Sequence, residues 1–177
     1  DRLSYSSTQT DAYDYFVNQI LGLREDSPAM ELGSKVHKLA EKLLKNEKYE
    51  KDEEIEVFEA NLKSQIKEIK ANYPKLVACE EKIVMPLSSL MKSTQPINFI
   101  AKIDAVFEGN GEYLIVDWKT DKTQDYAGEH RRQLEVYKRV ISASKGIPLE
   151  KIKVAIGFVA ISGRINVGVP LPVFDDK

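Results

Sequence analysis

Two aspartates lie on the strands of a predicted β-hairpin, where they are placed to share a metal ion. Residues 108–112 read Glu-Gly-Asn-Gly-Glu, and the Asn110-Gly111 pair is a strong signal for a two-residue hairpin turn. Counted outward from this turn, the register pairs Asp104 with Asp117. Two carboxylates directly opposite each other repel, so either one is protonated or the pair binds a cation. Carboxylate oxygens favour a hard divalent ion.

The same register places basic side chains beside these acids. Lys102 falls opposite Lys119, and strand alternation puts Lys119 on the face of Asp117. A solvent-exposed face, on which acids and lysines pair diagonally, is the alternative interpretation. The flanking positions on this face are apolar, which favours a partly covered site over an open surface. These positions are Ile100, Val106 and Ile115.

Other candidate side chains lie on predicted helices, and none of them is persuasive alone. His37 lies on the flank of a helical apolar stripe, where a lone histidine is more often structural than a ligand. Gln133 and Tyr137 are four residues apart and share a helix face, although Tyr137 also suits the core. Basic residues, among them Arg131 and Arg132, give this helix a surface suited either to solvation or to phosphate contacts.

Apolar periodicity predicts the elements that must position these residues. Helical spacing and cap signals predict helices over about 6–21, from Ser27-Pro28 to Leu44, over about 53–72 and over about 127–144. Alternating or continuous apolar runs predict strands over 77–85, 97–107, 112–119, 152–161 and 164–169. The odd positions from 97 to 107 form one unbroken apolar face. The strand, helix and strand between 112 and 161 predict a parallel crossover.

Composition limits the classes of protein that the chain can belong to. With 177 residues, 42% of them hydrophobic, we expect a single domain. A net charge of -2 argues against nucleic-acid binding by bulk positive charge, so any site for a polyanion must be local. A single cysteine, Cys79, excludes an internal disulfide and a metal site built only from cysteines of this chain. The longest apolar run, 154–161, is far short of the roughly 20 residues that cross a bilayer, which predicts a soluble, cytoplasmic protein.

Four segments together resemble the PD-(D/E)xK nuclease superfamily in its RecB-like branch. They are Gly33-Ser34-Lys35-Val36-His37, then Ile103-Asp104, then Leu114-Ile115-Val116 followed by Asp117-Trp118-Lys119-Thr120, and last Gln133-Leu134-Glu135-Val136-Tyr137. A bare Asp-x-Lys arises often by chance, whereas the order His, Asp, Asp-x-Lys, Gln-x-x-x-Tyr is specific. Ile103 stands where the name of the superfamily has Pro, a substitution that the RecB-like branch usually shows.

The resemblance implies a metal centre and a catalytic lysine. It implies that His37, Asp104 and Asp117, with the backbone carbonyl of Trp118, coordinate Mg²⁺ or Mn²⁺. Lys119 is then the catalytic lysine, which acts with Asp104 and Asp117 on a water that attacks the scissile phosphate.

The resemblance also has implications outside the metal centre. It implies that Gln133 and Tyr137 line the groove, where they hold nucleic acid or brace the catalytic residues. Many RecB-like relatives carry four cysteines that bind an iron–sulfur cluster. This sequence has none of these at either end, so we expect no iron–sulfur cluster.

These observations predict an α/β domain over residues 1–177 with a restriction-endonuclease-like core and a mixed central sheet flanked by helices. Residues 1–74 are mainly helical, and 75–177 form the sheet and its crossover helix. Since the first residue is Asp1, we expect either a fragment of a larger protein or a processed chain. The resemblance to the RecB-like branch implies a helicase as the parent protein or as a partner subunit. The predicted function is that of a metal-dependent DNA nuclease, a helicase-associated exonuclease of repair or recombination that acts on single-stranded DNA or DNA ends. A nuclease-fold DNA-binding module with little activity, and an RNA or flap nuclease, are the alternatives.

Overall fold

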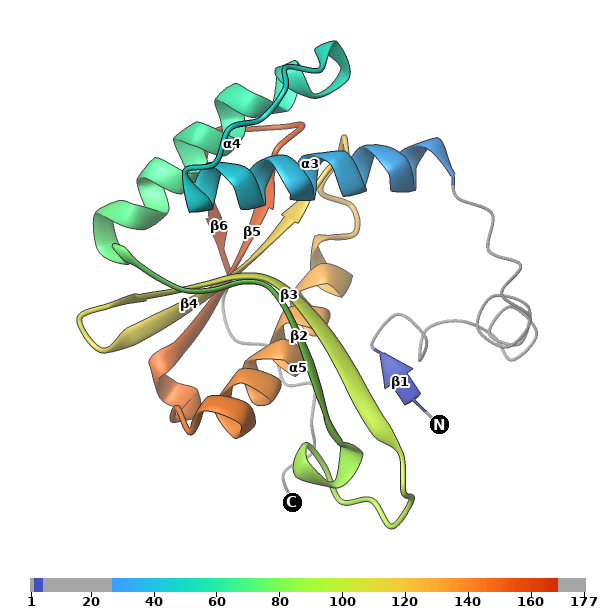
Figure 1. The fold of residues 1–177 in the computed structure, drawn as a ribbon. Coiled ribbons are helices and arrows are strands. Elements are labelled where there is room, and N and C mark those ends of the chain that lie inside the picture. The colour runs from blue at the N-terminus through green and yellow to red at the C-terminus, as the bar shows by residue number, and fades with distance from the viewer. Residues whose placement is uncertain (1, 5–26, 169–177) are drawn as a thin grey trace.

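The computed structural model describes residues 2–4 and 27–168, which form a six-stranded mixed sheet with helices against both faces (Figure 1). The strands are β1 (Arg2–Ser4), β2 (Lys75–Pro86), β3 (Asn98–Gly109), β4 (Glu112–Lys119), β5 (Ile152–Phe158) and β6 (Asn166–Val167). The helices are α3 (Pro28–Lys45), α4 (Glu53–Asn72) and α5 (Ala127–Lys145), with short 3-10 turns η2 (Leu87–Ser89) and η3 (Leu149–Lys151). The predicted α/β class is therefore confirmed, while the helix expected over 6–21 lies outside the described residues.

The helix ends and the hairpin turn lie where the local sequence signals predict them. Ser27 caps α3 by accepting the N–H of Met30, and α5 ends at Gly146 in the left-handed conformation. Asn110 and Gly111 both have positive φ, as a tight hairpin turn requires. The strand β5 runs parallel to β4, which confirms the crossover through α5. No helix in the described part of the chain is long and apolar enough to cross a membrane.

The strand β3 is the centre of the sheet, and its pairing is interrupted beside the candidate site. The edge strand β2 pairs antiparallel with β3 from Asn98 to Glu108 and so occupies one side of it. On the other side β4 pairs with residues 105–109 and β1 with residues 98–100. Among the described residues, positions 101–104 have no strand partner on that side. The sheet therefore opens at Asp104.

The hairpin register agrees with the sequence up to this opening. Ala105 pairs with Val116, and the ladder ends there. The expected next rungs, Asp104 with Asp117 and Lys102 with Lys119, lie where β4 leaves β3 and continues beside β5. The two aspartates thus sit at the point where the paired strands separate.

Two hydrophobic clusters hold the helices on the sheet. The helices α3 and α4 cover one face and α5 the other (Figure 1). The expectation of one continuous apolar face along β3 is wrong. Phe99, Ala101 and Ile103 join the α5 cluster, whereas Ala105 and Phe107 join the α3–α4 cluster. The exchange falls between Ile103 and Ala105, beside Glu80 of β2, which has a positive φ.

Candidate functional site

The two aspartates lie in the opening of the sheet and are buried. The side chain of Asp104 is 5% exposed and that of Asp117 is 8% exposed. Asp104 Oδ2 accepts the backbone N–H of Trp118 at 2.8 Å. This side chain therefore takes the place of a backbone partner for β4, at the position where the ladder has ended.

The electrostatics of this pair fit a cation. Burial, and next the negative charge of Asp117, raise the pKa of Asp104 well above its usual range. Lys119 Nζ lies 2.9 Å from Asp117 Oδ2, but this buried oxygen accepts no hydrogen bond from the described residues. The single ammonium of Lys119 balances only one of the two buried carboxylates, and the other is costly to bury unless it is protonated or a positive ion neutralises it. The carboxylate oxygens of Asp104 and Asp117 are therefore suitable ligands for a divalent metal ion.

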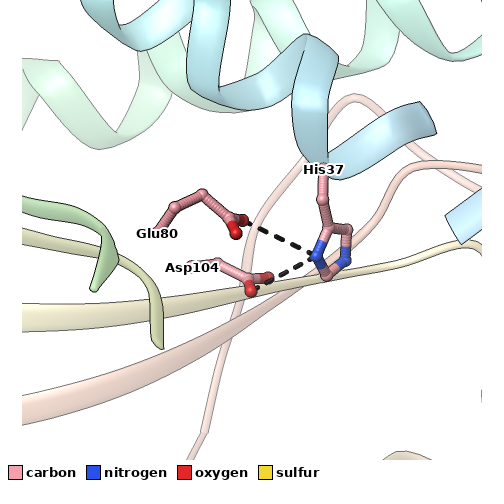
Figure 2. A group of neighbouring side chains, drawn as sticks. All are labelled: His37, Glu80 and Asp104. Atoms are coloured by element: carbon pink, nitrogen blue, oxygen red, sulfur yellow. Dashed lines mark ion pairs between the residues drawn. The ribbon is translucent and has the colours of Figure 1, made fainter. Parts of the chain in front are cut away.

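His37 reaches this pair from α3. One ring nitrogen, Nε2, lies 2.8 Å from the carbonyl oxygen of Trp118. The other, Nδ1, lies 3.4 Å from Asp104 Oδ1 and points toward the carboxylate of Asp104 (Figure 2). Val36, Leu39 and Ala40 pack α3 against the sheet, which directs the imidazole into the opening. The structure thus brings together four of the predicted residues from α3, β3 and β4.

Glu80 of β2 joins this group and was missing from the sequence-based candidates. Its Oε1 lies 3.8 Å from His37 Nδ1, and its Oε2 lies 2.5 Å from Lys102 Nζ. Ligand atoms of His37, Glu80 and Asp104 lie within 4.8 Å of one another, a spacing that could hold a metal ion (Figure 2). Glu80 has a φ of 50°, a left-handed backbone conformation that residues other than glycine rarely adopt. Nothing in the local sequence signals it, and only the β2–β3 register would have placed Glu80 beside Asp104.

Lys119 is held by α5. Its Nζ donates to Gln133 Oε1 at 3.4 Å, and Gln133 Nε2 donates to the hydroxyl of Tyr137 at 3.0 Å. Burial lowers the pKa of Lys119, but the charge and close contact of Asp117, together with the charges of Asp104 and Asp121, outweigh burial, so the pKa is raised and the ammonium stays charged. Tyr137 is buried, and burial raises its pKa above the usual value. Gln133 and Tyr137 therefore form a neutral brace behind the lysine.

The two arginines predicted to bind nucleic acid are placed differently. Arg131 Nη2 donates to Asn166 Oδ1 at 2.8 Å, so this side chain ties α5 to β6. Arg132 is exposed on α5. The contact of Arg131 with Asn166 does not join it to the carboxylates. The role of both arginines on a substrate stays a prediction.

Residues 4–166 match the family described as the PD-(D/E)XK nuclease superfamily. A search of curated proteins finds no match. The matched range contains every element that contributes to the opening, from α3 to α5, and the mixed sheet between helices is consistent with the restriction-endonuclease-like core.

Proposed function

Because this chain belongs to the PD-(D/E)XK nuclease superfamily, we propose that it is a Mg²⁺- or Mn²⁺-dependent deoxyribonuclease. Membership implies hydrolysis of phosphodiester bonds with a divalent metal. The observation that carries the proposal is the buried pair Asp104 and Asp117, with His37 and Lys119 at its edge. Such a pair is unfavourable in a purely structural role, because both carboxylates are kept from water.

The residues that would hold the ion are His37, Asp104, Asp117 and the carbonyl of Trp118. When bound, the ion neutralises charge on the scissile phosphate and lowers the pKa of a water molecule. Asp104 has the further task of holding the Trp118 peptide through its N–H, which leaves the carbonyl of that residue directed toward His37.

Lys119 acts in the chemical step. Its charged Nζ lies beside Asp117, where it orients the attacking water and stabilises the negative charge that develops on the phosphate oxygens. The water oxygen bonds to phosphorus and the water gives up a proton, the opposite P–O bond breaks, and the leaving oxygen takes up a proton, so the products are a phosphate end and a hydroxyl end. Gln133, backed by Tyr137, fixes the ammonium during this step.

The finer proposal is a RecB-like exonuclease associated with a helicase in DNA repair or recombination. It is supported by the order of His37, Asp104, the Asp117-x-Lys119 triplet and the Gln133-x-x-x-Tyr137 pair, which resembles that branch. Single-stranded DNA or DNA ends are the proposed substrates.

A cleavage assay tests this proposal. Labelled single-stranded DNA, linear duplex, closed circular DNA and RNA are incubated with Mg²⁺, with Mn²⁺ or with EDTA, and Asp117→Asn serves as the inactive control. Metal-dependent cleavage of linear DNA, with closed circles left intact, is the expected result. Binding of DNA without turnover would contradict the proposal and favour a DNA-binding module. Cleavage restricted to RNA or flaps would contradict the proposed substrate and favour an RNA or flap nuclease.

A further inference from the structure

A glutamine in α4 is buried against the sheet behind the candidate site. Gln65 is 0% exposed. Its Oε1 accepts the indole N–H of Trp118 at 3.1 Å, and its Nε2 donates to the carbonyl oxygen of Ser162 at 2.7 Å. A buried amide is costly unless both of its ends are bonded. Both ends are bonded here, so the structure accommodates this amide specifically.

Trp118, the partner of Gln65, lies between Asp117 and Lys119 and is 1% exposed. A different element binds each of its three polar groups. Asp104 of β3 accepts its backbone N–H, His37 of α3 contacts its carbonyl, and Gln65 of α4 accepts its indole N–H. Three contacts in different directions leave the residue little freedom to rotate or to shift along the strand.

The strand β5 closes the space around the Gln65–Trp118 hydrogen bond. Gly157 is the register partner of Trp118. A Cβ at position 157 would lie 2.4 Å from Gln65 Oε1 and 2.5 Å from Trp118 Cδ1. Glycine at this position therefore lets the amide and the indole approach each other directly over the backbone of β5.

We propose that Gln65 is a positioning residue of the metal site. It fixes the indole of Trp118, and through it the backbone carbonyl of Trp118 and the alignment of its neighbours Asp117 and Lys119. Strand alternation places the side chains of Asp117 and Lys119 on the face opposite the indole. If the backbone of Trp118 rotates, these two side chains are therefore displaced as well. This inference rests on the proposed function, since it concerns the geometry of the same site.

The same helix offers a matched control. Asn61 lies one turn before Gln65, and its Nδ2 donates to the carbonyl oxygen of Val159 at 2.7 Å. Both side chains tie α4 to the segment that follows β5, but only Gln65 contacts Trp118. Gln65→Leu and Asn61→Leu therefore each remove a hydrogen bond between α4 and the segment after β5. Only Gln65→Leu also removes the hydrogen bond to Trp118.

Trp118 is the only tryptophan of the chain, so its fluorescence reports on the residue in question. The experiment titrates Mn²⁺ into each purified protein and follows tryptophan emission, together with the melting temperature and the steady-state cleavage rate, kcat. Gln65→Leu should raise the Mn²⁺ concentration at the midpoint of the titration, or lower kcat, by roughly 10- to 100-fold. This is the effect expected when a residue that supports a metal ligand is removed. Asn61→Leu should lower the melting temperature and leave the Mn²⁺ midpoint and kcat at wild-type values.

A folded Gln65→Leu protein with the wild-type Mn²⁺ midpoint and kcat would overturn the inference. If this variant does not fold, Trp118→Phe breaks the same hydrogen bond from the other side and keeps the backbone carbonyl, and its Mn²⁺ affinity is measured by calorimetry. The same loss is expected there, and wild-type affinity and kcat would again overturn the inference. A wild-type protein that neither binds Mn²⁺ nor cleaves nucleic acid would remove the proposed function and the inference together, an outcome distinct from the failure of Gln65 alone.

Discussion

The surroundings of Lys119 keep its side chain charged, whereas the surroundings of Cys79 keep its thiol neutral. Lys119 keeps its charge although it is largely buried, because Asp117 lies 2.9 Å away. Cys79, in β2, is half-buried, and burial raises the pKa of its thiol to about 11. One side chain is thus kept charged beside the carboxylates, while the other is kept neutral.

The substitution Lys119→Ala should lower the single-turnover cleavage rate by roughly 10²-fold or more, the scale of losing one electrostatic group at the reacting atoms. The rise in melting temperature on adding Mg²⁺ should remain, since the carboxylates are unchanged. Lys153→Ala is the matched control, because Lys153 also pairs with an acid, Glu112 at 2.8 Å, but lies outside the site. Cleavage by Lys119→Ala at the wild-type rate would rule out the mechanism.

The raised pKa of Cys79 predicts slow alkylation of the native protein. At pH 8 only roughly one thiol in a thousand is ionised when the pKa is about 11, and the thiolate is the nucleophile. Iodoacetamide should therefore modify the folded protein far more slowly than the urea-unfolded protein, and the native rate should rise with pH toward 11. Cys79→Ser should leave cleavage intact. Fast native alkylation at pH 8, measured by mass spectrometry, would contradict the assigned environment.

At the scale of elements, the position of the β3–β4 hairpin depends on its contact with the end of α4. Gly109, the last residue of β3, lies against the C-terminus of α4, where a Cβ would meet Asn72 O at 2.0 Å and Tyr73 Cα at 2.8 Å. These are backbone atoms, so they cannot move aside as a side chain would. The hairpin that carries both aspartates is therefore seated on α4 through a glycine.

The substitution Gly109→Ala should destabilise the protein by about 1–3 kcal/mol or more, because the added methyl group forces backbone atoms apart. Gly128→Ala is the control, since this residue lies in α5 with open space around its Cβ position. Alanine there should stabilise the protein by about 0.5–1 kcal/mol through its higher helix propensity. Urea unfolding of both variants checks the pair, and equal effects of the two substitutions would refute this packing.

At the scale of the whole molecule, the candidate ligands join parts of the chain that are distant in sequence. His37 comes from α3, Asp104 from β3 and Asp117 from β4, while Glu80 approaches from the edge strand β2. An ion bound there would connect the helical layer to the sheet at the point where β3 and β4 separate. Metal binding should therefore stabilise the entire fold and not only a loop.

Adding Mg²⁺ should raise the melting temperature, because the ion binds the folded state alone. At 100 times the dissociation constant the gain is about 2.7 kcal/mol. Asp104→Ala and Asp117→Asn should abolish the gain, while Glu112→Gln, a change outside the site, should preserve it. Differential scanning calorimetry with and without the metal measures this. A wild-type melting temperature that does not respond to millimolar Mg²⁺ or Mn²⁺ would exclude the metal centre.

Local signals were sufficient for much of the fold. The Asn110-Gly111 turn fixes the β3–β4 register, because both residues tolerate positive φ and side-chain alternation leaves one pairing that keeps apolar residues on the buried faces. Ser27-Pro28 and Gly146 mark helix ends for equally local reasons. The register of the hairpin as far as Ala105 and Val116 could therefore be predicted from residues close together in the chain, whereas the expected rung between Asp104 and Asp117 does not form because the two strands separate there.

Long-range contacts decided the rest. The sequence carries no local signal that Glu80 adopts a left-handed backbone beside Asp104, or that β3 exchanges its apolar face at that position. Gln65 and Trp118 are 53 residues apart, and their hydrogen bond exists only because α4 packs over β4 and Gly157 leaves room for it. A buried polar side chain finds its partner through the packing of whole elements, and periodicity records only which face of an element is buried. The sequence alone thus determined the elements and the residue types at the site, and the tertiary structure decided which side chains meet there.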